Sequence, residues 1–252
     1  MSERYDYGRA GIIGLGTPQA NPTVEAEMRI LFDPTVLTQT VRLTSRAEAS
    51  NDRLREYLLG LESALERYDT LRPAAFGFAC TGSSYLVRAN DQALLLDRLQ
   101  QRFGYPIVTA TDAIAAELDS LGAKRIALAS PYPGTLSDAA AEFWRAAGFD
   151  VATVQRIDTG IADTRGIYTL GSADARPIAE ELAALDVDAV LLSGTGMPSL
   201  ALLAQATGKP TIISSNYCLA AQLCRVAGLP ALDRAQWTAR LAEATIAKEP
   251  LQ

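Results

Sequence analysis

The sequence contains no histidine, and this absence excludes several kinds of catalytic site at once. A Ser-His-Asp triad, a Cys-His pair, a histidine general base and a histidine-ligated metal all need an imidazole ring. Any acid–base chemistry must therefore come from cysteine, tyrosine, lysine, aspartate or glutamate side chains.

Cysteine is scarce as well, with only Cys80, Cys218 and Cys224 among 252 residues. An odd, sparse set is not a disulfide framework and indicates a reducing compartment. No pair has CxxC spacing, so no zinc or iron–sulfur site, and no metal site of any kind, is expected. Cys218 and Cys224 lie in a predicted helix over 217–227, and we interpret both as structural.

Basic charge and long apolar runs are also lacking. The chain has 23 Lys and Arg against 29 Asp and Glu, a net charge of −6, which argues against a nucleic-acid partner. No apolar run approaches the roughly 20 residues that span a bilayer. The N-terminal stretch MSERYDYGRAG lacks the apolar core of a signal peptide. A cytoplasmic protein without a membrane partner is therefore expected.

Short apolar runs alternate with longer amphipathic stretches along the whole chain. This pattern predicts an α/β fold with parallel sheets covered by helices on both faces. The predicted strands are 10–16, 39–43, 74–79, 106–110, 125–130, 151–157, 189–193 and 211–214. The predicted helices are 23–31, 50–68, 85–102, 111–121, 136–147, 174–185, 198–206 and 217–227.

The chain repeats itself at an offset of 114 residues. Cys80-Thr81-Gly82 falls on Gly194-Thr195-Gly196, and the first and second predicted strands fall on the fifth and sixth. We therefore expect two pseudo-symmetric, doubly wound lobes, each with a four-stranded parallel sheet. The expected divisions are an N-terminal lobe over 1–115, on which the C-terminal helix packs back, a C-terminal lobe over 116–230 and a helical tail over 231–252.

In doubly wound sheets, ligands bind beyond the carboxyl ends of the strands. The expected site is therefore a cleft between the loops 16–21, 80–83, 131–135 and 194–198. Cys80 follows a buried strand and precedes a helix, and the amides of Thr81, Gly82 and Ser83 form an anion-binding loop beside it. This position predicts a reactive thiol with a lowered pKa.

The other loops supply candidate groups for binding a carboxylate. Tyr132 lies in the rigid turn Ser-Pro-Tyr-Pro-Gly, from which its hydroxyl can point into the cleft. Asn21 either binds substrate or caps the first helix, and both readings stay open. Gly194, Thr195 and Gly196 allow a small anion to approach the backbone closely. They lack the full GxGxxG pattern, so a dinucleotide site is a weak alternative.

These residues together resemble the aspartate/glutamate racemase superfamily, and most closely its maleate cis-trans isomerase and arylmalonate decarboxylase branch. The resemblance covers most of the chain. It is carried by the motifs Asn21-Pro22-Thr23-Val24-Glu25, Ala79-Cys80-Thr81-Gly82-Ser83, Pro131-Tyr132-Pro133-Gly134-Thr135, Leu192-Ser193-Gly194-Thr195-Gly196-Met197-Pro198 and Ser214-Ser215-Asn216. It implies cofactor-free chemistry at a carbon beside a carboxylate, with Cys80 as the catalytic residue.

The chain departs from that family at the second-lobe cysteine and at the Asn after the sixth strand, near which Asp163-Thr164 stands. Racemases of the family use two facing cysteines, and arylmalonate decarboxylases keep one cysteine in the second lobe with glycine in the first. Here Cys80 matches the first-lobe cysteine and Gly194 stands at the second, which is the decarboxylase arrangement with the lobes exchanged. A single thiol does not supply the acid and the base that stereoinversion needs on opposite faces. A Gly194→Cys variant is therefore predicted to gain racemisation.

Three functions remain open on these residues. The preferred one is a cofactor-independent, arylmalonate-decarboxylase-like enzyme acting on a small mono- or dicarboxylate. The second is a maleate-isomerase-like enzyme with Cys80 as nucleophile, and the third is a carboxylate-binding protein without turnover. The sequence leaves the substrate and the oligomeric state, including a homo-oligomer, undecided.

Overall fold

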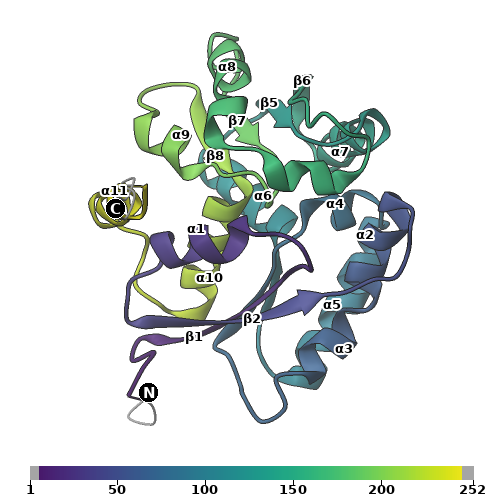
Figure 1. Cartoon of the computed structure of the whole chain (residues 1–252), viewed down its shortest axis with the longest axis vertical. Helices are drawn as coiled ribbons and strands as arrows, with labels where there is room; N and C mark the ends of the chain where they lie inside the picture. The colour runs from purple at the N-terminus through teal and green to yellow at the C-terminus, as the bar shows by residue number, and fades with distance from the viewer. Residues whose placement is uncertain (1–5, 246–252) are drawn as a thin grey trace, which may run out of the picture.

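A computed structural model describes residues 6–245, and the prediction of two four-stranded parallel sheets is confirmed in it. One sheet has the strand order β2-β1-β3-β4 and the other β6-β5-β7-β8, with every neighbouring pair parallel. Figure 1 shows the two sheets as separate lobes, with α1 and α4 in the region between them. No helix within residues 6–245 is long and apolar enough to cross a membrane.

The elements follow one another in the predicted alternating order. The first sheet and its helices comprise β1 (Gly11–Pro18), α1 (Thr23–Leu31), β2 (Val36–Leu43), α2 (Ser50–Leu59), α3 (Leu61–Glu66), β3 (Ala75–Phe78), α4 (Thr81–Tyr85), α5 (Ala89–Phe103), β4 (Ile107–Thr109) and α6 (Ala110–Ser120). The second comprises β5 (Arg125–Ser130), α7 (Gly134–Ala146), β6 (Asp150–Arg156), the 3₁₀ helix η1 (Thr164–Thr169), α8 (Ser172–Ala183), β7 (Ala189–Leu192), α9 (Leu200–Gln205), β8 (Thr211–Ser214) and α10 (Ser215–Ala227). A final helix, α11 (Arg234–Thr245), falls within the predicted C-terminal tail.

The internal repeat is visible in the strands. β1 and β5, β2 and β6, and β3 and β7 each start 114 residues apart. The register is lost before the last strands, because the 15-residue α5 corresponds to the six-residue α9. The central strands β3 and β7 are fully buried, as expected of parallel strands covered on both faces.

Two predicted helices are broken in the structure. The stretch 50–68 is interrupted at Gly60, so α2 and α3 are separate. The stretch 85–102 is replaced by the short α4 and by α5, which starts at Ala89 and ends on Gly104 in the left-handed conformation (φ 77°). Because α4 begins at Thr81, Cys80 directly precedes a helix, whereas the predicted helix began at residue 85.

Helix α10 of the second half packs on the first sheet. A Cβ at Gly77 of β3 would lie 2.7 Å from Leu223 Cδ1 and 3.4 Å from Leu219 Cδ1, both on α10. Glycine at this position in β3 is therefore what lets the helix lie directly on the strand. The contact between α10 and β3 therefore connects the second half of the chain to the sheet of the first.

A buried carboxylate makes a second connection between the halves. Glu27 of α1 accepts hydrogen bonds from the backbone amides of Ser199 (2.5 Å) and Leu200 (3.1 Å) at the start of α9. It also accepts one from Asn216 Nδ2 of α10 at 2.7 Å. Burial raises the pKa of Glu27, and these hydrogen bonds oppose that shift. The network fixes α1, which follows the first loop of the site.

Candidate active site

Cys80 lies at the carboxyl end of β3, one residue before α4, and is only 4% exposed. The Ser83 hydroxyl donates a hydrogen bond to its Sγ at 3.1 Å. Burial raises the pKa of the thiol, while hydrogen bonds from Ser83 and from the backbone of Gly82 act in the opposite direction. The predicted lowered pKa is therefore wrong. Burial outweighs the five-residue α4, and the thiol is protonated at neutral pH.

A small cavity of about 20 Å³ adjoins the thiol, and we call it the thiol chamber. All four predicted loops contribute to it. Its lining residues are Pro18, Asn21, Leu54, Cys80, Tyr132, Thr164, Ile167, Tyr168, Thr195 and Gly196. A space of this size holds about one water molecule, so its walls must move apart to admit a carboxylate substrate.

Tyr132 enters the chamber from the loop after β5. Its hydroxyl lies 2.5 Å from Thr81 Oγ1, and its ring packs edge-on against Tyr85 with centroids 6.0 Å apart. Its carbonyl accepts hydrogen bonds from Ser137 Oγ and Arg156 Nε, which hold the turn. Burial raises the pKa of Tyr132 well above 10, so the phenol stays protonated and able to donate a hydrogen bond.

Asn21 caps the first helix, which is one of the two roles left open by the sequence, and it also lines the chamber. Its Oδ1 accepts hydrogen bonds from the amides of Thr23 (2.9 Å) and Val24 (3.3 Å) at the start of α1. Its Nδ2 points to Thr195 Oγ1 at 3.4 Å, and Thr195 in turn donates to the carbonyl of Ala79 at 2.8 Å. Capping α1 thus orients the amide toward the chamber, beside the residue that precedes Cys80.

Gly196 lines the chamber at a position where no larger residue would fit. A Cβ at this position would lie 2.7 Å from Cε1 of Tyr168. The Gly196 carbonyl also accepts a hydrogen bond from Thr23 Oγ1 at 2.7 Å. The glycine therefore allows the tyrosine ring to cover the chamber.

Four predicted site residues, Thr81, Gly82, Ser83 and Gly194, do not line the chamber, although Thr81 Oγ1 contacts the hydroxyl of Tyr132, which does. Gly82 is buried against Leu54 and Leu136, and the Ser83 hydroxyl donates its hydrogen bond to the Cys80 thiol. Gly194 has φ +100°, whereas Cys80 has φ −152°, so the two aligned positions differ in backbone conformation. The sequence repeat aligned them correctly but could not show this difference.

We expect Gly194→Cys to lower stability. A side chain at φ +100° costs about 1–2 kcal/mol, and the new Cβ would lie 3.0 Å from Pro131 Cγ. In a chain of this size, the melting temperature should fall by about 3–6 °C. The Cβ of the new cysteine would lie 3.6 Å from the hydroxyl of Tyr132, which lines the chamber. Any gain in racemisation should therefore come together with the loss of stability.

Gly148→Cys is the matched control. Gly148 has φ +96°, and a Cβ there would meet no atom within 4 Å. Both variants are compared by thermal melting and by deuterium entry into the two product enantiomers. A Gly194→Cys protein as stable as the wild type would contradict the expected strain.

Several chamber residues were not predicted from the sequence. Thr164, Ile167 and Tyr168 belong to η1, which follows β6 and had no recognisable apolar periodicity. Leu54 belongs to the predicted helix over 50–68, and nothing in the sequence distinguished it as a site residue. The aromatic residues near the thiol share a raised pKa caused by burial, which in Tyr57 reaches about 12. They keep the surroundings of Cys80 weakly polar but uncharged.

The nearest ion pair joins the two halves outside the chamber. The Arg53 guanidinium, almost fully buried, contacts Asp163 Oδ1 at 2.7 Å. Arg165 binds the same carboxylate at 2.9 Å and, with Arg53, holds the pKa of Asp163 well below its usual range. Within residues 6–245, no cluster of three or more His, Cys, Asp or Glu side chains is placed to hold a metal ion.

Comparisons with known proteins agree with this geometry. The sequence profile described as arylmalonate decarboxylase matches residues 74–241. A maleate isomerase of Pseudomonas putida KT2440 is 23% identical over 225 residues, covering 82% of this chain and 89% of that protein.

Solved structures show the same fold. A Cys-to-Ser variant of Nocardia farcinica maleate cis-trans isomerase, with a covalently bound succinylcysteine intermediate, has a TM-score of 0.78 at 20% identity. The match covers 89% of this chain and 98% of that one. A liganded double variant of arylmalonate decarboxylase, Gly to Cys and Cys to Ser, has a TM-score of 0.72 at 22% identity, covering 86% and 92%. The profile match spans most of the chain, and the chain therefore belongs to the arylmalonate decarboxylase family of the aspartate/glutamate racemase superfamily.

Proposed function

We propose that this protein is a cofactor-independent decarboxylase of a small substituted malonate, with Cys80 as the proton donor. The observation that carries the proposal is a single buried, protonated thiol in a chamber of hydrogen-bonding groups, facing a lobe that has glycine at the aligned position. A protonated thiol suits a reaction that needs one acid and no base.

The proposed reaction has two steps. Cleavage of the bond between the α-carbon and one carboxylate releases CO₂ and leaves its electron pair in an enediolate on the remaining carboxylate. Hydroxyl groups of Thr81 and Tyr132 and the amide of Asn21 donate hydrogen bonds to the enediolate oxygens. Cys80 then transfers its S–H proton to the α-carbon, and the resulting thiolate regains a proton from solvent.

A variant of a relative supports this assignment of the thiol. In the double variant of arylmalonate decarboxylase, cysteine is introduced at a glycine and removed 114 positions later. Cys80 and Gly194 of this chain are separated by the same distance in sequence. This chain thus has a cysteine at the first of two such positions and none at the second, as in that liganded variant, with glycine here where the variant has serine.

A second candidate function is cis–trans isomerisation of an alkene diacid. It is favoured by the covalent succinylcysteine intermediate in the Nocardia farcinica enzyme. By this route the Cys80 thiolate adds to one alkene carbon, and the adjacent carbon becomes an enediolate. Rotation about the resulting single bond is followed by elimination of the thiolate, which restores the double bond in the trans form.

The dependence of kcat/KM on pH separates the two routes. A thiol that donates a proton must be protonated, and its raised pKa keeps it so through neutral pH. Decarboxylation should therefore have a constant rate from about pH 7 and fall only as pH rises through the Cys80 pKa. A thiolate nucleophile gives the opposite slope, with a rate that rises about tenfold per pH unit up to that pKa. Initial rates between pH 6.5 and 10.5 distinguish these profiles.

A substrate panel in D₂O tests the proposal directly. Substituted malonates, maleate and 2-substituted acids are incubated with the protein, and the products are followed by NMR. The proposal predicts CO₂ release from malonates with one deuterium entering one product enantiomer. Conversion of maleate alone would replace the proposal by the isomerase function, and no turnover of any acid would leave the binding-protein interpretation.

A further inference from the structure

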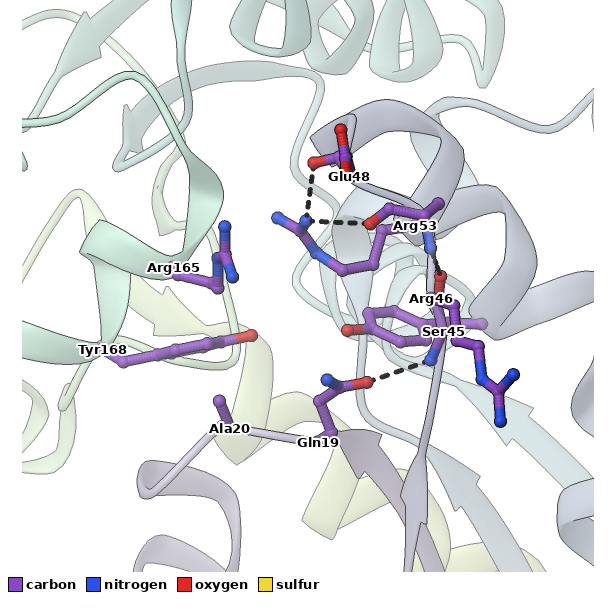
Figure 2. A pocket seen from close by; sticks show the side chains of 10 residues that line it. Gln19, Ala20, Ser45, Arg46, Glu48, Arg53, Arg165 and Tyr168 are labelled. Carbon is purple, nitrogen blue, oxygen red and sulfur yellow. Dashed lines mark hydrogen bonds between the residues drawn. The ribbon is translucent and has the colours of Figure 1, made fainter.

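A second, larger cavity lies next to the thiol chamber, and we call it the outer pocket. It has a volume of about 270 Å³, and Tyr168 lines both spaces. Its other lining groups come from the loops after β1 and β2, from α2 and from η1, including Arg46, Arg53, Tyr57 and Arg165. Figure 2 shows the Tyr168 hydroxyl and the Arg165 guanidinium extending into it from the η1 side.

The outer pocket has an excess of positive charge. Arg53 is fully engaged with Asp163, Ser50 and the carbonyls of Ala47 and Glu48. Arg165 shares the Asp163 carboxylate. Arg46 makes no hydrogen bond or ion pair within the described residues 6–245, but its guanidinium points away from Tyr168 and Arg165 (Figure 2). The excess charge inside the pocket therefore comes from Arg53 and Arg165, which share one carboxylate. The carboxylates here are those of Asp163, which is occupied by two arginines, and Glu48, which lies at the rim beyond Arg53 (Figure 2).

Hydroxyl groups add donors to that charge. Tyr57 and Tyr168 line the outer pocket, and neither hydroxyl has a hydrogen-bond partner in the part of the chain that the structure describes. Burial raises the pKa of both phenols, so both stay protonated. Apolar lining is limited to two alanines and the tyrosine rings, which gives an aryl substituent little apolar surface to bury against.

We propose that the outer pocket binds an additional carboxylate at the end of the substrate's substituent. The inference rests on the proposed function, which places the reactive carbon beside Cys80. Since the thiol chamber has room for about one water molecule, a substituent on that carbon extends past Tyr168 toward the arginines. The preferred substrate is then a malonate with an acidic aliphatic arm, and an arylmalonate is a poor one.

Binding to a Cys80→Ala protein tests this without turnover. Butylmalonate and (3-carboxypropyl)malonate have arms of similar length that differ in terminal charge. Calorimetry should show the carboxylate arm binding about tenfold more tightly at low salt, because it gains a charge-assisted hydrogen bond. The advantage should shrink as ionic strength rises, since the Arg165 side chain is exposed.

Arg165→Gln in the same background should remove most of that advantage, because Arg53 alone then balances the charge of Asp163, and should leave butylmalonate affinity unchanged. Arg225→Gln, on the exposed surface of α10, is the matched control and should keep it. Equal affinity for the two malonates, or an advantage that survives Arg165→Gln, would overturn the proposal.

Wild-type turnover separates this inference from the proposed function. Decarboxylation of butylmalonate without any preference for the acidic arm would overturn the outer-pocket assignment alone. Arg165-dependent binding of (3-carboxypropyl)malonate without turnover of either malonate would support the pocket and overturn the chemistry. Failure of both malonates to bind would overturn both.

Discussion

Cys80→Ala is expected to lower kcat/KM by about a thousandfold, because proton transfer by a positioned side chain contributes roughly 10²–10⁴. No histidine can replace the thiol, and the phenols around it have raised pKa values that make them weak acids. Rates with the preferred acid from the substrate panel measure the effect. The same acid should still bind, since the hydrogen-bond donors of the chamber remain.

Cys224→Ala is the matched control for this variant. Cys224 is also a free, buried cysteine, but it lies on α10 and lines neither the chamber nor the outer pocket. Its replacement should leave kcat unchanged and lower stability by the loss of buried volume alone. If Cys80→Ala leaves turnover intact, the thiol is not the acid. If the wild type shows no turnover and Cys80→Ala only alters affinity, the protein binds carboxylates without converting them.

Alkylation offers an independent view of the same thiol. The raised pKa and 4% exposure predict slow reaction of Cys80 with iodoacetamide at neutral pH, contrary to the fast labelling expected of a thiol at a helix start. A bound dicarboxylate should slow it further.

The sequence predicted the fold better than the state of the site. Strand positions followed from apolar runs and from the repeat, because both depend on burial along the chain. The repeat also aligned Cys80 with Gly194. It could not show that Gly194 has φ +100°, or that burial outweighs the hydrogen bonds around the Cys80 thiol. Both properties depend on segments far away in the sequence.

The chamber residues of η1 were not predicted from the sequence for a similar reason. Tyr168 became recognisable only when η1 was placed over Gly196, since nothing in its neighbouring residues distinguishes it from a surface tyrosine. Asn21 was easier, because one amide both caps α1 and faces Thr195. A helix cap can be predicted from neighbouring residues, and here the capping side chain also points its amide nitrogen toward Thr195.

Tyr132→Phe is expected to lower kcat by about a hundredfold, as loss of one donor to a developing oxyanion typically does. In the closed chamber, the Tyr132 hydroxyl is bonded to Thr81 Oγ1 and is therefore held close to the thiol before substrate arrives. KM should change little, because the bond to the enediolate is stronger than the bond to the ground-state carboxylate.

Tyr105→Phe provides the control, since the Tyr105 hydroxyl is buried, has no hydrogen-bond partner among residues 6–245 and lies outside both cavities. It should leave kcat unchanged. Thr81→Val completes a cycle with Tyr132→Phe. Because the two hydroxyls contact each other and are proposed to bind the same enediolate, their combined loss should be smaller than the product of the separate losses. Fully multiplicative losses would mean that the two groups act independently, and an unchanged kcat in Tyr132→Phe would remove this hydroxyl from the mechanism.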